Sequence, residues 1–311
     1  MTYENGVRRY CFEALTDIWT GSVTHSKEKD QIKESISPDR LIPTGLIGSI
    51  RWWFEVLVRG LGGNACDPTQ TSCEGRDHCV ACELFGCTGW GGKFRFTVFD
   101  SGGIKTRQIK KGDCFRLHFV PLRYICHEEW ALLGSTLRLV SQYGAIGGKT
   151  ALVPPAKDYG LVKMRNEPKE PERGRIRAYL HLPKWRRFDQ SGFEWASLKH
   201  FWYVRDCYLR KSCKKKANTF AQVVRPDYDR DKPGSNDRTR WLTGSRGESK
   251  RVFSFRESEA RRTFGFVNPS IIDLASMEER LRKVAAWGEE WEFITRVLDV
   301  LVPSRSNDNA I

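Results

Sequence analysis

Four cysteines close together in the chain are the residues whose type and spacing best suit specific chemistry. Cys66, Cys73, Cys79 and Cys82 lie within 17 residues. The Cys79-x2-Cys82 spacing lets one turn of the chain present two thiolates to a tetrahedral zinc ion, and the other two cysteines can supply the second pair. Four thiolates would leave no open coordination position, so we expect a structural zinc site without catalytic chemistry.

The ligand set has alternatives on the sequence alone. The six-residue gap between Cys66 and Cys73 is looser than in a standard zinc finger, and Cys87 or His78 could replace Cys73. The alternative interpretation is that the four cysteines are reduced thiols in a loop that binds no metal. Zinc would order the Cys- and Gly-rich insertion at residues 64–92, which has few apolar side chains of its own.

Positive charge is concentrated in one part of the chain. The 311 residues carry a formal net charge of +14, and residues 161–270 hold 27 Lys and Arg against 13 Asp and Glu, so the remainder is neutral overall. Such an excess typically faces a polyanion. Because the segment shows no basic amphipathic helix of the membrane-binding kind, we expect nucleic acid.

Aromatic residues alternate with the cations of this basic segment, for example around Trp185, Trp202 and Trp241. Single-stranded RNA requires this combination, because rings stack on bases and cations contact phosphates. The run of lysines at 211–216 is equally explained as a solvated charge run. We place RNA contacts in the segment at Arg186, Arg205, Arg240, Arg246 and Arg251.

Two features of the first half could also receive a phosphate. In the turn at 144–149, glycines bring backbone N–H groups close to an anion and a lysine adds charge, although a plain turn has the same composition. Arg51 lies near a predicted helix start that favours anions, but it can instead pair with Glu55 one turn later. The candidate residues of the turn are Gly144, Gly147, Gly148 and Lys149.

Residues arranged for catalysis are scarce. Of the six histidines, His25 is the one placed to act as a general base in metal-independent RNA cleavage, and it has no evident partner. Nucleotide-binding, serine-hydrolase and zinc-protease motifs are absent. We expect a protein that binds RNA without cutting it; the alternatives are an endoribonuclease using His25 and a zinc-stabilised scaffold that binds only proteins.

Apolar periodicity predicts the elements that position these residues. Strands are expected at 8–15, 94–100, 115–122 and 159–164, helices at 44–61 and 128–143, and a loop or arm at 20–37. The order is that of a ferredoxin-like α+β sheet with helices on one face. We expect this domain at 1–164.

A charged, proline-containing stretch at 168–174 predicts a boundary before a smaller, basic α+β domain at 165–311. In this second domain the patterns predict strands at 175–182, 251–255 and 262–267 and a helix at 194–211. A long C-terminal helix is expected at 277–301, weakened at Gly288. No internal repeat is evident, although two copies of one fold could have diverged.

Several strings of the first half resemble a known family. They are LIPTGLIGSIRWWF at 41–54, RGLGG at 59–63, the Cys79-x2-Cys82 pair with ELFGCTGW after it, KFRF at 93–96 and GAIGGK at 144–149. Together they resemble the first subunits of Cmr complexes, the type III-B CRISPR effectors, within the RAMP superfamily. Weaker similarity continues to residue 267 through RWLTG at 240–244 and FGFV at 264–267.

This resemblance implies two ferredoxin-like, RRM-like domains in a non-catalytic subunit that grips the 3′ part of the CRISPR RNA and helps to position target RNA in antiviral defence. The implied partners are CRISPR RNA, target RNA and other RAMP subunits. Trp90 and Lys93 join the candidate RNA contacts, and the Trp90 ring either stacks on a base or serves the core. The residues after the glycine turn, 150–155, lack the basic, serine-rich run of the family.

No apolar stretch is both long enough and sufficiently free of charge to cross a membrane, and the first residues carry no secretion signal. We therefore expect a cytoplasmic protein. In that compartment the ten cysteines are thiols or metal ligands rather than disulfides.

Overall fold

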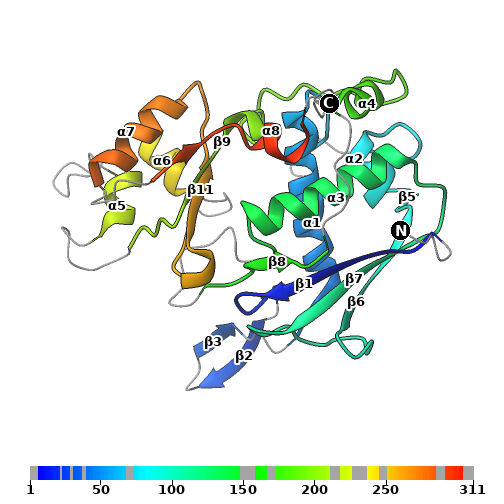
Figure 1. Ribbon diagram of the computed structural model, residues 1–311, viewed down its shortest axis with the longest axis horizontal. Coiled ribbons are helices and arrows are strands. Elements are labelled where there is room, and N and C mark those ends of the chain that lie inside the picture. The colour runs from blue at the N-terminus through cyan, green and yellow to red at the C-terminus, as the bar shows by residue number, and fades with distance from the viewer. Residues whose placement is uncertain are drawn as a thin grey trace, which may run out of the picture. The chain divides into compact units, whose positions relative to one another are not determined.

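The computed structural model describes residues 6–21, 23–28, 31–36, 40–67, 73–147, 158–166, 173–210, 218–225, 237–244, 251–284 and 291–303. They form a mixed α+β protein with antiparallel sheets (Figure 1). The chain divides into two compact units. Unit 1 comprises residues 1–149, 159–193 and 298–311, and unit 2 comprises residues 150–158 and 194–297.

The main sheet of unit 1 has four antiparallel strands in the order β6 (Phe94–Asp100), β7 (Cys114–Pro121), β1 (Arg8–Ala14) and β8 (Val162–Met164). Helix α1 (Pro43–Gly60) connects β1 to β6, and α3 (His127–Gln142) connects β7 to β8. This strand–helix–strand–strand–helix–strand order is the ferredoxin-like arrangement that the sequence predicts.

Alternating side chains explain why this sheet packs against its helices. Along β1, Tyr10, Phe12 and Ala14 are buried, whereas the residues between them are exposed or half-buried. Helix α1 buries an apolar face that includes Leu46 and Trp53. Full burial of one such large apolar side chain contributes about 1.5–3 kcal/mol, so these positions form the core of unit 1.

Smaller elements complete unit 1, and two of them differ from the prediction. They are β2 (Val23–Glu28), β3 (Gln31–Ile36), α2 (Val80–Phe85), β4 (Gly86–Cys87), β5 (Trp90–Gly91) and α4 (Arg173–Leu180). The loop expected at 20–37 contains the β2–β3 hairpin. The strand expected at 175–182 is helix α4 instead, because Ile176, Tyr179 and Leu180 are buried at helical spacing.

The sheet of unit 2 repeats the same topology. Its antiparallel strands lie in the order β10 (Val252–Phe255), β11 (Arg262–Phe266), β9 (Phe201–Arg205) and β12 (Phe293–Ile294). Helices α5 (Thr219–Val224) and α6 (Asp237–Thr243) lie between β9 and β10 in sequence, and α7 (Leu274–Val284) lies between β11 and β12.

Two helices predicted in the second half are wrong. Residues 194–211 contain a short 3-10 turn (Leu198–His200) and strand β9, because the apolar run at 201–204 belongs to a central strand that is buried on both faces. The long helix expected at 277–301 is divided into α7, β12 and α8 (Val297–Leu301), and Gly288 lies outside the described residues.

The division between the units also differs from the boundary expected at residue 165. Residues 173–193 pack with unit 1: the Asn64 side chain donates to the Phe188 carbonyl at 2.9 Å and accepts from the Phe188 N–H at 3.0 Å. Near the C-terminus, Arg173 pairs with Asp299 at 2.9 Å within the same unit. Residues 173–193 therefore belong to unit 1, and the described residues put the division between the units after residue 193.

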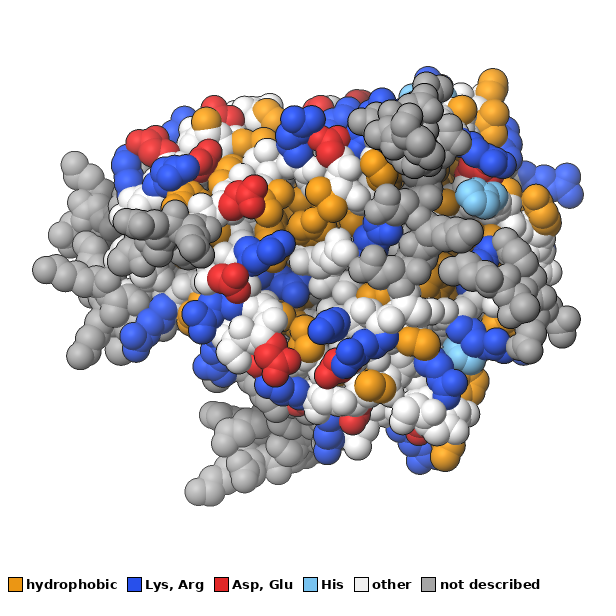
Figure 2. Space-filling model, in the orientation of Figure 1, with side chains coloured by type: hydrophobic (Ala, Val, Ile, Leu, Met, Phe, Trp, Pro, Cys, Tyr) orange, Lys and Arg blue, Asp and Glu red, His pale blue; other side chains and the backbone are white. Residues whose placement is uncertain are grey.

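Basic side chains on the face shown in Figure 2 are interspersed with acidic and hydrophobic ones. Among the described residues, no helix combines the length and the apolar character that crossing a membrane requires.

Candidate metal centre and nucleic-acid interface

The loop after α1 and the start of α2 bring together the four cysteines predicted as zinc ligands. Cys66 and Cys73 come from the loop, Cys79 caps the N-terminus of α2, and Cys82 lies in its first turn. All four side chains are buried, and their sulfur atoms lie within 4.8 Å of one another. The x2 spacing thus acts as predicted, because a helix start turns both thiols to one side.

The sulfur separations fit a tetrahedral ion. Zinc–sulfur bonds of about 2.3 Å place the sulfurs of a tetrahedral site about 3.8 Å apart. The Sγ of Cys66 lies 3.5 Å from that of Cys82 and 3.7 Å from that of Cys79. Soft thiolates in this geometry select zinc or an iron–sulfur centre over hard cations, so the donor set fits a structural zinc ion.

Backbone donors and neighbouring thiols stabilise negative charge on the sulfurs. The N–H of Cys79 donates to Cys73 Sγ at 3.3 Å, and the N–H of Cys66 donates to Cys79 Sγ at 3.5 Å. Hydrogen bonds from the thiols of Cys66 and Cys73 lower the pKa of Cys79. The same contact with Cys79 raises the pKa of Cys66 to about 11. A bound cation would favour the thiolate at all four positions.

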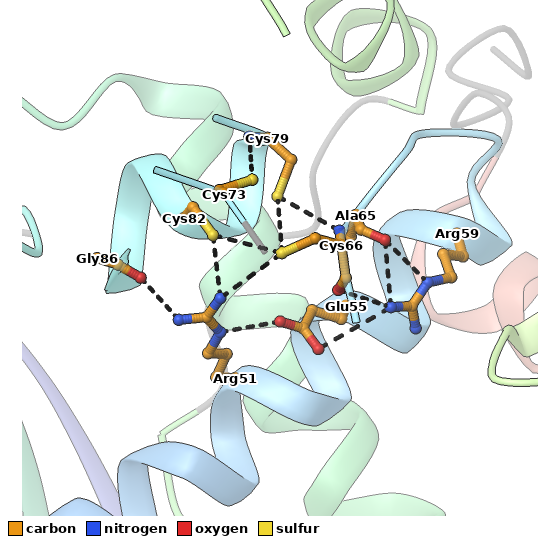
Figure 3. A network of polar contacts seen from close by, with 9 residues as sticks. All are labelled: Arg51, Glu55, Arg59, Ala65, Cys66, Cys73, Cys79, Cys82 and Gly86. Carbon is orange, nitrogen blue, oxygen red and sulfur yellow. Dashed lines mark hydrogen bonds and ion pairs between the residues drawn. The ribbon is translucent and has the colours of Figure 1, made fainter. Parts of the chain in front are cut away.

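Three charged residues on one face of α1 hold the cysteine loop (Figure 3). The Arg51 guanidinium donates to Cys82 Sγ at 3.1 Å, to the Gly86 carbonyl at 2.7 Å and to Glu55 at 2.9 Å. Arg59, two turns along, donates to the carbonyl oxygens of Ala65 and Cys66 at 3.3 and 3.1 Å. Arg51 was a candidate phosphate contact, and its guanidinium instead contacts Glu55 and the cysteine cluster.

Glu55 lies between the two arginines and is buried. Burial raises the pKa of Glu55 to about 7, although Arg51 and Arg59 oppose this shift. A thiolate centre carries excess negative charge, which the guanidiniums of Arg51 and Arg59 can balance. The sequence left the Arg51–Glu55 pair as the alternative to a phosphate contact, and it did not indicate that this pair lies beside the cysteines.

The two alternative ligands lie outside the sulfur cluster. Both ring nitrogens of His78 are engaged, Nδ1 with the Gly75 carbonyl at 3.0 Å and Nε2 with Glu83 in a short contact. Cys87 is half-buried and does not belong to the group of four. The sequence left these two residues as options because spacing does not show which sulfur faces inward.

Lys93 and Trp90, both candidate RNA contacts, belong to a buried network beside this centre. Lys93 Nζ pairs with Glu83 at 2.6 Å and with Glu129 at 2.8 Å. Burial would lower the pKa of Lys93, but these two carboxylates raise it overall. The Trp90 ring contacts the His78 ring and the Arg123 guanidinium, with centroid distances of 4.8 and 4.2 Å. These contacts occupy both side chains.

Packing explains the described glycines of the 144–149 turn. A Cβ atom on Gly144 would lie 2.7 Å from the Trp53 ring, and one on Gly147 would lie 2.5 Å from the Trp19 carbonyl oxygen. Gly147 has a φ of +107° and donates its N–H to Ser49 Oγ at 3.0 Å. Gly148 and Lys149 lie outside the described residues.

The predicted contacts of the basic segment differ widely in exposure. Arg205 on β9 and Arg240 on α6 are exposed, and Arg186 is half-buried and pairs with Asp77 at 3.6 Å. Arg251 is buried, with its guanidinium 3.9 Å from the Trp195 ring centroid and 5.2 Å from that of Trp241. Arg246 lies outside the described residues, and His25 lies on β2 opposite Glu34.

Comparison with family models finds one match, which covers a little less than half of the chain. The family model of the RAMP superfamily matches residues 11–152. No curated protein sequence matches the chain.

Three solved structures are similar to the chain. The crystal structure of apo Cmr1 from Pyrococcus furiosus matches with a TM-score of 0.47 and 11% identity, over 92% of this chain and 98% of that chain. A chain of the Csm3–Csm4 subcomplex of a type III-A CRISPR-Cas interference complex matches with a TM-score of 0.28 and 17% identity, over 51% and 74% of the two chains. A chain of a type IV-B CRISPR complex matches with a TM-score of 0.31 and 11% identity, over 57% and 99%.

Proposed function

We propose that this chain is a non-catalytic, RNA-binding subunit of a type III-B CRISPR effector complex, because the family model of the RAMP superfamily matches residues 11–152. In this proposal the chain grips the 3′ part of the CRISPR RNA, helps to position target RNA and packs against other RAMP subunits. The family match carries the proposal, because it covers strands β6 and β7, most of β1, both connecting helices and the cysteine insertion.

The charge distribution supports an RNA ligand. The chain carries a formal net charge of +14, and Arg205 and Arg240 of unit 2 expose their guanidinium groups. Phosphate contacts of this kind do not depend on base identity, as a subunit that accepts many different guide sequences requires. Arg251 and Lys93 contribute through packing instead, because their side chains are buried.

The proposal that the chain does not cut RNA is supported by the position of the contact between His78 and Glu83. His78 contacts Glu83, but His78 is buried beside Lys93 and the cysteine cluster, out of reach of an RNA backbone. A general base must come within hydrogen-bond reach of the 2′-hydroxyl that it activates. Incubation of the chain with repeat RNA in EDTA tests this: intact RNA is expected, and discrete cleavage abolished by His25→Ala would contradict it.

We further propose that Cys66, Cys73, Cys79 and Cys82 hold one structural zinc ion. The geometric fit and burial of the four sulfurs support this proposal. The ion would tie the loop after α1 to the start of α2, and with four protein ligands it would supply no chemistry. Elemental analysis of freshly reduced protein is expected to find about one zinc per chain, and less than about a tenth would contradict the site.

Copurification and salt dependence test the RNA-binding role. The tagged chain should copurify with CRISPR RNAs and other RAMP subunits, identified by RNA sequencing and mass spectrometry. Affinity for a CRISPR RNA should fall steeply between about 50 and about 300 mM salt, because cations released from the RNA drive binding. An affinity that barely changes over this range would contradict the electrostatic account.

A further inference from the structure

One face of the unit 1 sheet remains accessible on the side opposite α1 and α3. Strand pairing places Arg9 opposite His118 and Cys11 opposite Arg116 on the central strands, and Thr97 and Phe99 extend these two rows onto β6. All of these side chains are exposed or half-buried, whereas their sequence neighbours are mostly buried on the helix side. We call this surface the open face; its further residues are Glu13, Arg95, Cys114, Val120 and Lys163.

The open face is positively charged although residues 1–160 carry little excess charge, with 20 Lys and Arg against 17 Asp and Glu. It carries four cations, Arg9, Arg95, Arg116 and Lys163, and one carboxylate. That carboxylate, Glu13, pairs with Arg165, which follows β8. Successive side chains of a strand point to opposite faces of the sheet, and here the cations lie on the open face. The net charge summed along the sequence does not reveal this arrangement.

The cations of the open face differ in how firmly they are held. The Nη2 of Arg116 donates to the carbonyl oxygens of Asp100 and Ser101 at 3.1 and 2.9 Å, so this guanidinium is fixed over the sheet. Arg95 and Lys163 are exposed on the two edge strands. They stand three strand spacings apart across the sheet, about 14 Å, and six residues apart along it, about 20 Å, so they would contact different phosphates of an extended strand.

Two rings lie between these cations. The ring centroids of Phe99 and His118 are 4.5 Å apart with their planes inclined by 48°. Burial, together with Arg9 and Arg116, lowers the pKa of His118, so its imidazole is neutral near pH 7. Neutral rings half-exposed on a sheet are platforms on which unpaired bases stack.

We propose that the open face binds a stretch of single-stranded RNA, with Phe99 and His118 as a stacking platform and Arg9, Arg95 and Lys163 as phosphate contacts. The inference deepens the proposed function and rests on it, because it assumes that the ligand is RNA. Charge complementarity favours RNA over a second protein, since the paired Glu13 leaves no acidic group to receive a partner's cations.

Matched charge variants of the full chain test this inference. The face variant Arg95→Ser/Lys163→Ser removes two exposed cations from the open face. The control variant Arg177→Ser/Arg187→Ser removes two exposed cations on and after α4, which lies against α3 on the other side of the sheet. Binding of a fluorescent single-stranded oligouridine RNA is measured at about 0.1 M salt. We expect a loss of about tenfold for the face variant and less than about twofold for the control.

Three other outcomes of this binding experiment would contradict the proposal. If both variants lose affinity equally, RNA binding follows net charge and the open face is not the site. If neither variant changes its affinity for RNA, the open face does not bind RNA. If the unaltered chain does not bind the RNA, the proposed function itself is wrong.

A second measurement does not depend on charge. Cross-linking with RNA that carries 4-thiouridine should label peptides containing Phe99 or His118, and Phe99→Ala should reduce that label at least fivefold. Labels confined to residues 201–266 would contradict the open face while supporting RNA binding by unit 2.

Discussion

The two sheets of this molecule share one topology but differ in what their central strands expose. In unit 1, β1 and β7 alternate between buried and accessible side chains. In unit 2, Trp202 and Val204 of β9 face a core formed with α5, α6 and α7, and residues on the other face, such as Phe264 and Phe266, are also buried. One face of the unit 1 sheet therefore stays accessible, whereas the strands of the unit 2 sheet are buried on both faces.

This difference shows why net charge along a segment is a poor guide to a binding surface. The basic segment places two of its arginines, Arg251 and Arg262, in buried positions, and burial lowers the pKa of Arg262. The open face of unit 1, in contrast, presents four cations, and Arg9, Arg95 and Arg116 among them come from outside the basic segment. Which side of a strand carries the charge matters more than how many charges a segment contains.

A substitution that removes one proposed zinc ligand should have the largest effect on stability, and that effect should be confined to unit 1. We expect Cys82→Ser to cost more than about 4 kcal/mol of unfolding free energy, because it leaves three buried thiols and Arg51 without their common partner. Hydrogen exchange should rise in peptides from 64–92 and α1 but not in β9 and β11. Cys114→Ser, an exposed cysteine of the same unit, is the control and should have no effect.

An equal rise of exchange in β9 and β11 would show that the two units unfold together. It would contradict a metal effect confined to unit 1.

A methyl group added to the unit 2 sheet should have the next largest effect. The Cβ of Gly265→Ala would lie 2.3 Å from the Arg251 carbonyl oxygen and 2.7 Å from the Trp202 ring. Because both sides of this strand are filled, we expect a loss of about 2–3 kcal/mol in denaturant unfolding. Gly48→Ala on α1 meets nothing within 4 Å and should instead stabilise by about 0.5–1 kcal/mol. A tolerated Gly265→Ala would mean that the unit 2 sheet is not closed on both faces.

Titration of two histidines, one in each unit, should give the smallest effect. Burial lowers the pKa of both His118 in unit 1 and His200 in unit 2. Each depressed pKa means that the unfolded chain binds more protons, so stability falls as the pH drops below about 6.5 and through the folded-state value. His118→Gln and His200→Gln should each reduce this acid sensitivity in denaturation measured between about pH 5 and pH 7.5.

Adding single-stranded RNA distinguishes the two rings. Phosphates beside the open face should raise the pKa of His118 in an NMR titration and leave that of His200 unchanged, because an anion favours the charged imidazole. A shift at His200 alone would reverse the comparison between the sheets.

Much of unit 1 could be predicted from the sequence, because apolar residues recur at regular spacing in its main elements. These are β1, β6, β7, α1 and α3. The cysteine quartet could also be predicted, since a helix start fixes the Cys79–Cys82 pair. The partners of Lys93 and Arg251 could not, because Glu129 and Trp195 come from distant segments and no local pattern joins them.

The open face and the strand pairing of unit 2 could not be predicted from the sequence, because the spacing of apolar residues does not reveal which strands pair or in what register. Placing Arg9 beside His118 requires the register between β1 and β7, and a slip of one residue would move every side chain to the other face. In unit 2, the apolar run at 201–204 fits a buried helix as well as a central strand, and only its pairing with β11 decides between them.

Helix α1 makes the glycine turn and the sulfur centre close neighbours. Ser49 holds the Gly147 N–H, and Arg51, two residues later, holds Cys82 from another side of the same helix. The two contacts are separated by about one helix diameter, roughly 10 Å. Oxidative damage at the cysteines would therefore shift α1 and disturb the turn at Gly147.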